Sequence, residues 1–168
     1  DNQPLNTDAL NPPQDQLDAL VNLYHSGQIS KAEQACRELL EVYPQSTIVL
    51  NVQAVLLTIA RKFHDALEIF DKILQINPSY AEGYGNRGIV LKELKQLEQA
   101  IESYDTAIQL NPNYAGAHNN RGNALKELGR MEEAMQSIDR AIQINPDLAE
   151  AYVSRGAIRK DLGFPEQA

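Results

Sequence analysis

Proline recurs along this chain at a fixed interval of 34 residues, and that interval constrains the fold more than any other feature. The prolines are Pro44, Pro78, Pro112 and Pro146, and alanines keep the same step at Ala32, Ala66, Ala100, Ala134 and Ala168. Residues 81–114 and 115–148 align with 17 identities in 34 positions. Such a period is typical of stacked units that bury their apolar faces against their neighbours. The sequence therefore predicts a repeat array.

Apolar residues within each unit follow helical spacing. In 81–114 they recur every three or four residues, which predicts one helix over roughly 81–94 and a second over roughly 97–110. The Asn-Pro pair at 111–112 is expected to end the second helix, because proline disfavours α geometry in the residue before it. Each unit is therefore expected to be an antiparallel helical hairpin, and the protein to be all-α.

Small residues recur where the two helices of a hairpin would meet. Gly88, Gly122 and Gly156 occupy one position of the first helix, and the alanine series that includes Ala100 occupies one position of the second. A glycine inside a helix costs about 1 kcal/mol relative to alanine. Its recurrence therefore indicates close helix packing.

Helix starts are expected to use capping boxes, Ser79 with Glu82 and Asp147 with Glu150.

The pattern of small, aromatic and proline residues resembles the tetratricopeptide repeat. It is carried by Gly88, Ala100, Tyr104, Ala107 and Pro112, and again by Gly122, Ala134, Ile138, Ala141 and Pro146. The resemblance covers residues 13–168 and implies a right-handed superhelical solenoid of antiparallel helix pairs. The expected segments are a flexible leader 1–12, a divergent first repeat 13–46, complete repeats 47–80, 81–114 and 115–148, and a partial fifth repeat 149–168.

The partial repeat ends in Pro-Glu-Gln-Ala, which aligns with the start of a second helix at Leu97 and Met131. We therefore expect the chain to be a fragment of a longer array. An array that stops there would expose apolar surface, so we also expect self-association through the open C-terminal end.

Composition excludes several classes of protein. The chain has 23 acidic and 15 basic residues and a formal net charge of −8, which disfavours nucleic-acid binding. Its single cysteine, Cys36, excludes an internal disulfide framework and a cysteine-based zinc site. No apolar run is long enough to span a membrane, and the first residues lack the features of a signal peptide. We expect a cytoplasmic protein.

The sequence contains no catalytic motif in the structural context that its chemistry requires. The stretch GYGNRG at 83–88 satisfies the dinucleotide-binding pattern, but it lies inside a predicted helix and follows no strand. His25, His64 and His118 fall in different units without clustered carboxylates, which argues against a metal site. His118 stands at the position of Tyr84 and Tyr152, so it is expected to be a packed or half-exposed ring. We therefore predict no cofactor, no metal and no enzyme activity for this chain.

Rows of polar residues recur on the first helices of the units from residue 81 onward. In tetratricopeptide repeats this first helix lines the ligand groove. The candidate groove residues are Asn86, Asn119, Asn120, Asn123, Lys92, Lys126 and Lys160. The lysines are equally consistent with ordinary solvated helix ends, which the helix dipole favours. Asparagine forms helices poorly, so its repetition indicates a use, and an amide can both donate to and accept from a peptide backbone.

Arginines repeat on the same helices and aspartates on the second helices. Arg87, Arg121 and Arg155 are expected to pair either with Asp71, Asp105 and Asp139 or with helix ends, and so to join adjacent hairpins. The leading functional hypothesis is a protein–protein interaction scaffold that binds a peptide or partner protein in its groove. The alternative is a substrate-recognition arm of a larger glycosyltransferase or sulfotransferase, since Asn86 and Asn120 resemble the asparagine row of O-linked N-acetylglucosamine transferases.

Overall fold

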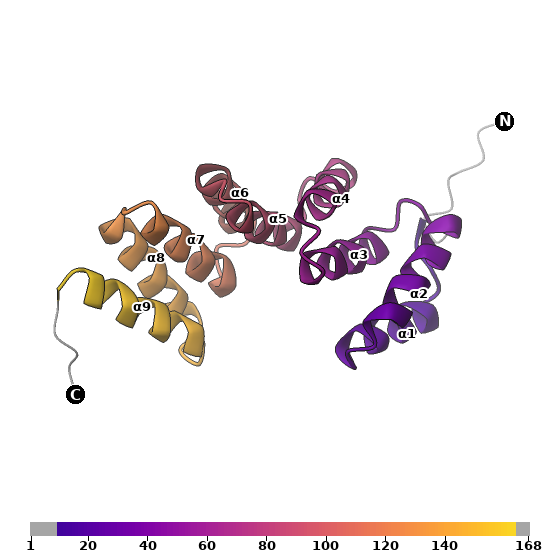
Figure 1. The fold of residues 1–168 in the computed structure, drawn as a ribbon, viewed down its shortest axis with the longest axis horizontal. Helices are drawn as coiled ribbons and strands as arrows, with labels where there is room; N and C mark the ends of the chain where they lie inside the picture. The colour runs from indigo at the N-terminus through magenta and orange to yellow at the C-terminus, as the bar shows by residue number, and fades with distance from the viewer. Residues whose placement is uncertain (1–9, 164–168) are drawn as a thin grey trace. The chain divides into compact units, whose positions relative to one another are not determined.

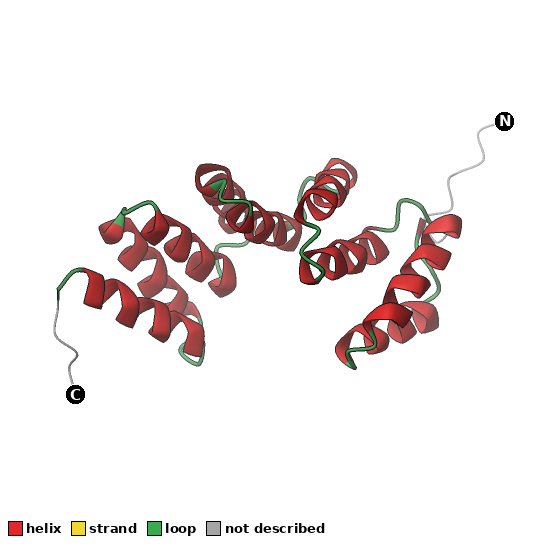
Figure 2. Cartoon of the chain, in the orientation of Figure 1, coloured by secondary structure: helices red, strands yellow, loops and turns green. Residues whose placement is uncertain are grey.

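The structure, a computed structural model, describes residues 10–163, and within that range it contains nine helices and no strand (Figures 1 and 2). The helices are α1 Gln14–His25, α2 Ile29–Val42, α3 Thr47–Ile59, α4 Phe63–Ile76, α5 Ala81–Glu93, α6 Leu97–Leu110, α7 Ala115–Glu127, α8 Met131–Ile144 and α9 Ala149–Asp161. The all-α prediction is confirmed. The two helices predicted within 81–114 are confirmed to within one residue as α5 and α6.

Two compact units divide the chain, Asp1–Pro78 and Ser79–Ala168. In the first unit α1 packs against α2 and α3 against α4, and α3 also contacts both helices of the preceding hairpin. In the second unit α5 pairs with α6 and α7 with α8, while α9 packs against both α8 and α7. The hairpins predicted from the apolar spacing are therefore present in both units.

The recurrent glycines let the helices of a hairpin meet closely, as predicted. A Cβ atom added at Gly88 would lie 2.5 Å from Cε1 of Tyr104, and one added at Gly122 would lie 2.6 Å from Cδ1 of Ile138. At Gly156 the same atom would meet nothing within 4 Å among the described residues. The start of a second helix predicted at 165–168 lies outside the described residues, and self-association through this end stays a prediction.

The turn inside each hairpin repeats with the period of the sequence. Its residues with positive φ are Gly27, Arg61, Lys95, Gly129 and Gly163, at φ of 71°, 59°, 61°, 76° and 78°. Successive members of this set are 34 residues apart. Glycine occupies this left-handed position three times, and a residue with a long cationic side chain occupies it twice.

Each predicted capping box begins one residue before the N-cap that the structure shows. The N-cap residues of α5 and α9 are Tyr80 and Leu148, and neither side chain makes a capping hydrogen bond. The asparagine of the Asn-Pro pair organises the turn instead, because Asn145 Oδ1 accepts from the backbone N–H of Asp147 at 3.1 Å. Asn111 does the same for Asn113 at 3.2 Å.

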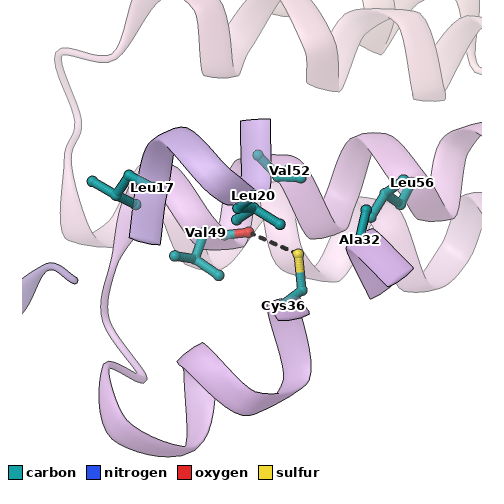
Figure 3. Close-up of a cluster of buried hydrophobic side chains, with 7 residues drawn as sticks. All are labelled: Leu17, Leu20, Ala32, Cys36, Val49, Val52 and Leu56. Carbon is teal, nitrogen blue, oxygen red and sulfur yellow. Dashed lines mark hydrogen bonds between the residues drawn. The ribbon is translucent and has the colours of Figure 1, made fainter. Parts of the chain in front are cut away.

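A cluster of apolar side chains forms the core of the first unit (Figure 3). Its buried members are Leu17, Leu20, Ala32, Cys36, Val49, Val52 and Leu56. Cys36 Sγ lies 4.0 Å from the carbonyl oxygen of Val49, and burial raises the pKa of this thiol to about 11. Cys36 is therefore a small buried hydrophobic residue, as predicted, and a poor nucleophile.

Buried Ser46 starts α3 and also holds the chain before α1. Its hydroxyl accepts from the backbone N–H of Val49 at 3.5 Å and donates to Asn11 Oδ1 at 2.8 Å. Asn11 and buried Pro12 belong to the predicted leader 1–12, whose first nine residues lie outside the described residues.

Candidate functional site

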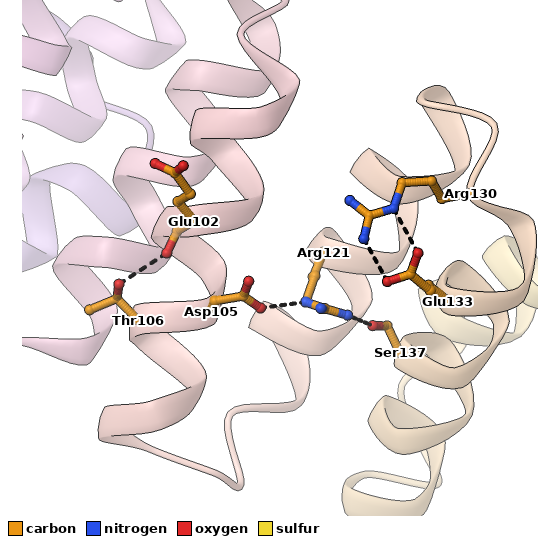
Figure 4. A network of polar contacts seen from close by, with 7 residues as sticks. All are labelled: Glu102, Asp105, Thr106, Arg121, Arg130, Glu133 and Ser137. Carbon is orange, nitrogen blue, oxygen red and sulfur yellow. Dashed lines mark hydrogen bonds and ion pairs between the residues drawn. The ribbon is translucent and has the colours of Figure 1, made fainter.

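Arginines tie neighbouring hairpins of the second unit together (Figure 4). Arg121 of α7 donates from Nε to Asp105 of α6 at 2.5 Å and from Nη1 to the buried hydroxyl of Ser137 on α8 at 2.6 Å. One repeat later, Nη1 of Arg155 on α9 lies 3.6 Å from Oδ1 of Asp139 on α8. The predicted arginine–aspartate pairing is confirmed at these two positions. These arginines are engaged in holding helices together.

A groove of about 430 Å³ lies between α7 and α9 in the second unit. Its lining residues are Asn119, Asn120, Asn123, Ala149, Glu150, Val153 and Ser154. The helical spacing of α7 places the three asparagines on one face, and the packing of α9 against α7 supplies the opposite wall. Three of the seven residues predicted for the ligand groove are thus brought together.

Asn119 gives this groove an unmet hydrogen-bonding group. Its side chain lines the groove although the residue is only 3% exposed, and its Oδ1 has no hydrogen-bond partner among residues 10–163. A buried polar atom without a partner costs about 1–3 kcal/mol. Because the amide can rotate about χ2, a donor inside the groove can reach this oxygen. Asn119 is therefore a residue of this groove whose hydrogen-bonding capacity is left unfilled by residues 10–163.

The predicted lysine row lies outside this groove, and two of its members have acidic neighbours. Lys92 Nζ lies 3.9 Å from Glu93, and Lys126 Nζ lies 3.2 Å from Asp161 of α9. These ion pairs offset the positive charge that an acidic ligand would meet. Lys160 is exposed on α9, and Asn86 is half-buried on α5. Their part in ligand binding stays a prediction.

The first unit carries a groove of different character, about 500 Å³ in volume, between α1 and α2. It is lined by Gln16, Ala19, Leu20, Leu23, Ala35, Glu38, Leu39, Val42 and Tyr43. Ala19 and Ala35 stand at the positions that Arg121 and Ser137 occupy in the hairpin 115–148, where α6 covers the corresponding face. This groove is thus equivalent to a face that another helix covers elsewhere in the chain.

The histidine, cysteine and acidic side chains of the described residues do not form a cluster that could hold a metal ion. His118 is half-buried, with Nε2 3.1 Å from the carbonyl oxygen of Pro112, and burial lowers its pKa. His118 is therefore a packed ring, as predicted. None of the helices between residues 10 and 163 has the length and apolar character needed to cross a membrane.

Comparison with known families identifies the repeat. Profiles described as tetratricopeptide repeat match residues 17–81, 69–102 and 115–148, and one described as TPR repeat matches 90–129. These matches overlap and together span residues 17–148. No curated protein sequence matches the chain significantly.

Solved structures with the same fold include the MamA protein, which is 23% identical over 89% of this chain and 81% of its own, with a TM-score of 0.74. MamA 41-end from Desulfovibrio magneticus RS-1 is 18% identical over 89% of this chain and 86% of its own, with a TM-score of 0.75. The first TPR of Spaghetti (RPAP3), bound to the HSP90 peptide SRMEEVD, is 25% identical over 71% of this chain and 94% of its own, with a TM-score of 0.68. These likenesses confirm a tetratricopeptide-repeat solenoid.

Proposed function

Because the chain belongs to the tetratricopeptide-repeat family, we propose that it is a non-catalytic interaction scaffold that holds a peptide segment of a partner protein between α7 and α9. The observation that carries this proposal is the buried Oδ1 of Asn119, which lacks a donor and belongs to a side chain that lines the groove.

Asparagine suits this role because its amide has both a donor and an acceptor. An extended peptide presents an N–H and a C=O at each residue, so an amide beside it can satisfy either group without reading the peptide's sequence. Asn119 and Asn123 are one helical turn apart on α7, and Asn120 lies between them. Val153, which is 74% exposed, offers an apolar contact on the opposite wall. A TPR domain bound to a peptide, as in RPAP3, is consistent with this mode of binding.

The alternative, a substrate-recognition arm of a larger transferase, rests on the resemblance carried by Asn86 and Asn120. It also calls for a peptide in the groove and differs only in what the captured segment is presented to. A transferase domain in the same polypeptide would favour it. It stays a prediction.

A randomised nine-residue peptide library displayed on phage tests the proposal. Peptides selected on the wild-type protein should bind the double variant Asn119→Ala/Asn123→Ala about tenfold more weakly, since two hydrogen bonds of about 0.5–1.5 kcal/mol each would be lost. Asn113→Ala is the control, because Asn113 is an exposed asparagine in the turn before α7 and does not line the groove. Circular dichroism checks that each variant is folded. Equal binding to the double variant, or no enrichment at all, would contradict the proposal.

A further inference from the structure

The charge of the α7–α9 groove comes from one side chain. Among its seven lining residues, Glu150 is the only acidic or basic one. Glu150 lies in the first turn of α9, is exposed, and makes no ion pair with any described residue. The other lining groups are amides, a hydroxyl and two apolar side chains. The groove therefore presents a negative charge beside its hydrogen-bonding wall.

Cations on the neighbouring helices do not balance this carboxylate. Lys126, which follows the asparagines on α7, pairs with Asp161 at the far end of α9. Arg155 pairs with Asp139 of α8, and with Arg159 it lines a separate cavity between α8 and α9. These three positive side chains of α7 and α9 are therefore directed to other acids or to another surface, and within the groove lining only Glu150 carries a charge.

We propose that the α7–α9 groove selects a peptide segment carrying lysine or arginine at the position that faces Glu150. This inference rests on the proposed function and deepens it by naming the ligand class. The peptide backbone supplies the N–H for Asn119, a small apolar side chain contacts Val153 and Ala149, and the cationic side chain extends to the Glu150 carboxylate. The preference is opposite in sign to the acidic peptide SRMEEVD bound by RPAP3.

The test uses the same phage library, selected in parallel on the wild-type protein, Glu150→Gln and Glu150→Lys. Glu132→Gln is the matched control, because Glu132 is also an exposed acid in the first turn of a helix but lies on α8 and away from the groove. The leading wild-type peptide is then synthesised with its basic residue kept, replaced by glutamine, or replaced by glutamate. Binding is measured by fluorescence anisotropy at low and high salt.

Wild-type selections should enrich lysine or arginine at one position, and Glu150→Lys should enrich aspartate or glutamate there instead. Glu150→Gln should weaken binding of the basic peptide by about 2–5-fold, as for an exposed ion pair, and leave the glutamine peptide unchanged. The difference should shrink at high salt, and Glu132→Gln should behave as wild type. Enriched peptides without a basic position, or with an unchanged preference in Glu150→Lys, would overturn this inference and leave peptide binding standing. No enrichment over the Asn119→Ala/Asn123→Ala variant would overturn both.

Discussion

One substitution, glycine to alanine, should have opposite effects at Gly88 and Gly156, although the two glycines stand at the same position of their repeats. At Gly88 an added methyl would lie 2.5 Å from Cε1 and 2.8 Å from Cδ1 and Cζ of Tyr104. The Tyr104 ring is rigid and fully buried, so it cannot turn aside. At Gly156 the methyl would meet nothing within 4 Å in the described structure.

The change in the free energy of unfolding is the balance of two effects, overpacking of the core and helix propensity. Overpacking a filled core costs about 1–3 kcal/mol, while alanine is favoured over glycine in a helix by about 1 kcal/mol. Three ring atoms inside normal contact distance place Gly88→Ala near the upper end of the first range. The net loss of unfolding free energy is then about 1–2 kcal/mol. Gly156→Ala changes only the helix propensity, so its free energy of unfolding should rise by up to about 1 kcal/mol.

Thermal unfolding followed by circular dichroism measures both variants. Gly88→Ala should lower the Tm by about 2–8 °C, and Gly156→Ala should raise it by about 2–4 °C or leave it unchanged. The double variant Gly88→Ala/Tyr104→Leu supplies a control, because a smaller and flexible side chain should recover part of the loss. A Gly88→Ala protein as stable as the wild type would refute the claim that glycine is needed for close packing between α5 and α6.

Four further predictions concern stability, reactivity and pH. Arg121→Met should lower the free energy of unfolding by about 1–2 kcal/mol in urea titration, because its bonds to α6 and α8 are lost, after discounting for its partial exposure. Its matched control is Arg130→Met, which removes an exposed ion pair at the start of α8 and should leave the free energy of unfolding nearly unchanged. Gly129→Ala should cost about 1–2 kcal/mol through backbone strain alone, because φ is 76° there and the added methyl would meet nothing within 4 Å among the described residues; an unchanged urea midpoint would count against that backbone geometry. Cys36, with its pKa raised to about 11, should resist alkylation at pH 8 until the protein is unfolded, and rapid labelling of the native protein would show that it is not buried. Burial lowers the pKa of His118 in the folded protein, so the unfolded chain binds more protons at acidic pH. The free energy of unfolding should therefore fall as the pH drops below about 6.5, and it should fall less in His118→Tyr. A parallel decline in both proteins would exclude His118 as the cause.

Features that depend on repetition could be predicted from the sequence. The 34-residue step and the Asn-Pro pair locate α5 and α6 because apolar periodicity and proline act over a few residues. Gly88 and the pairing of Arg121 with Asp105 were also predictable, since recurrence at one repeat position indicates a shared contact between neighbouring helices.

Features that depend on competition between nearby groups could not be predicted from the sequence. Asp147 has the spacing of a capping residue, but its own backbone N–H is taken by the side chain of Asn145, and α9 begins after Leu148. The neutralising partner of Lys126 is Asp161 on α9, and the lysine row alone does not reveal it. The spacing of Glu150 from Asp147 predicts only a capping role, because nothing in the local sequence shows that α9 places Glu150 in the asparagine-lined groove.

The most direct test of the central claim is to follow the side-chain amides of asparagine by NMR while a library-selected peptide is added. These groups give resolved ¹H–¹⁵N signals and report contacts of the side chain itself. If a peptide binds between α7 and α9, the side-chain signals of Asn119, Asn120 and Asn123 should shift together and saturate at the affinity measured by anisotropy, while that of Asn113 should not move. Shifts confined to the first unit or to the turns, with these three signals unchanged, would contradict it.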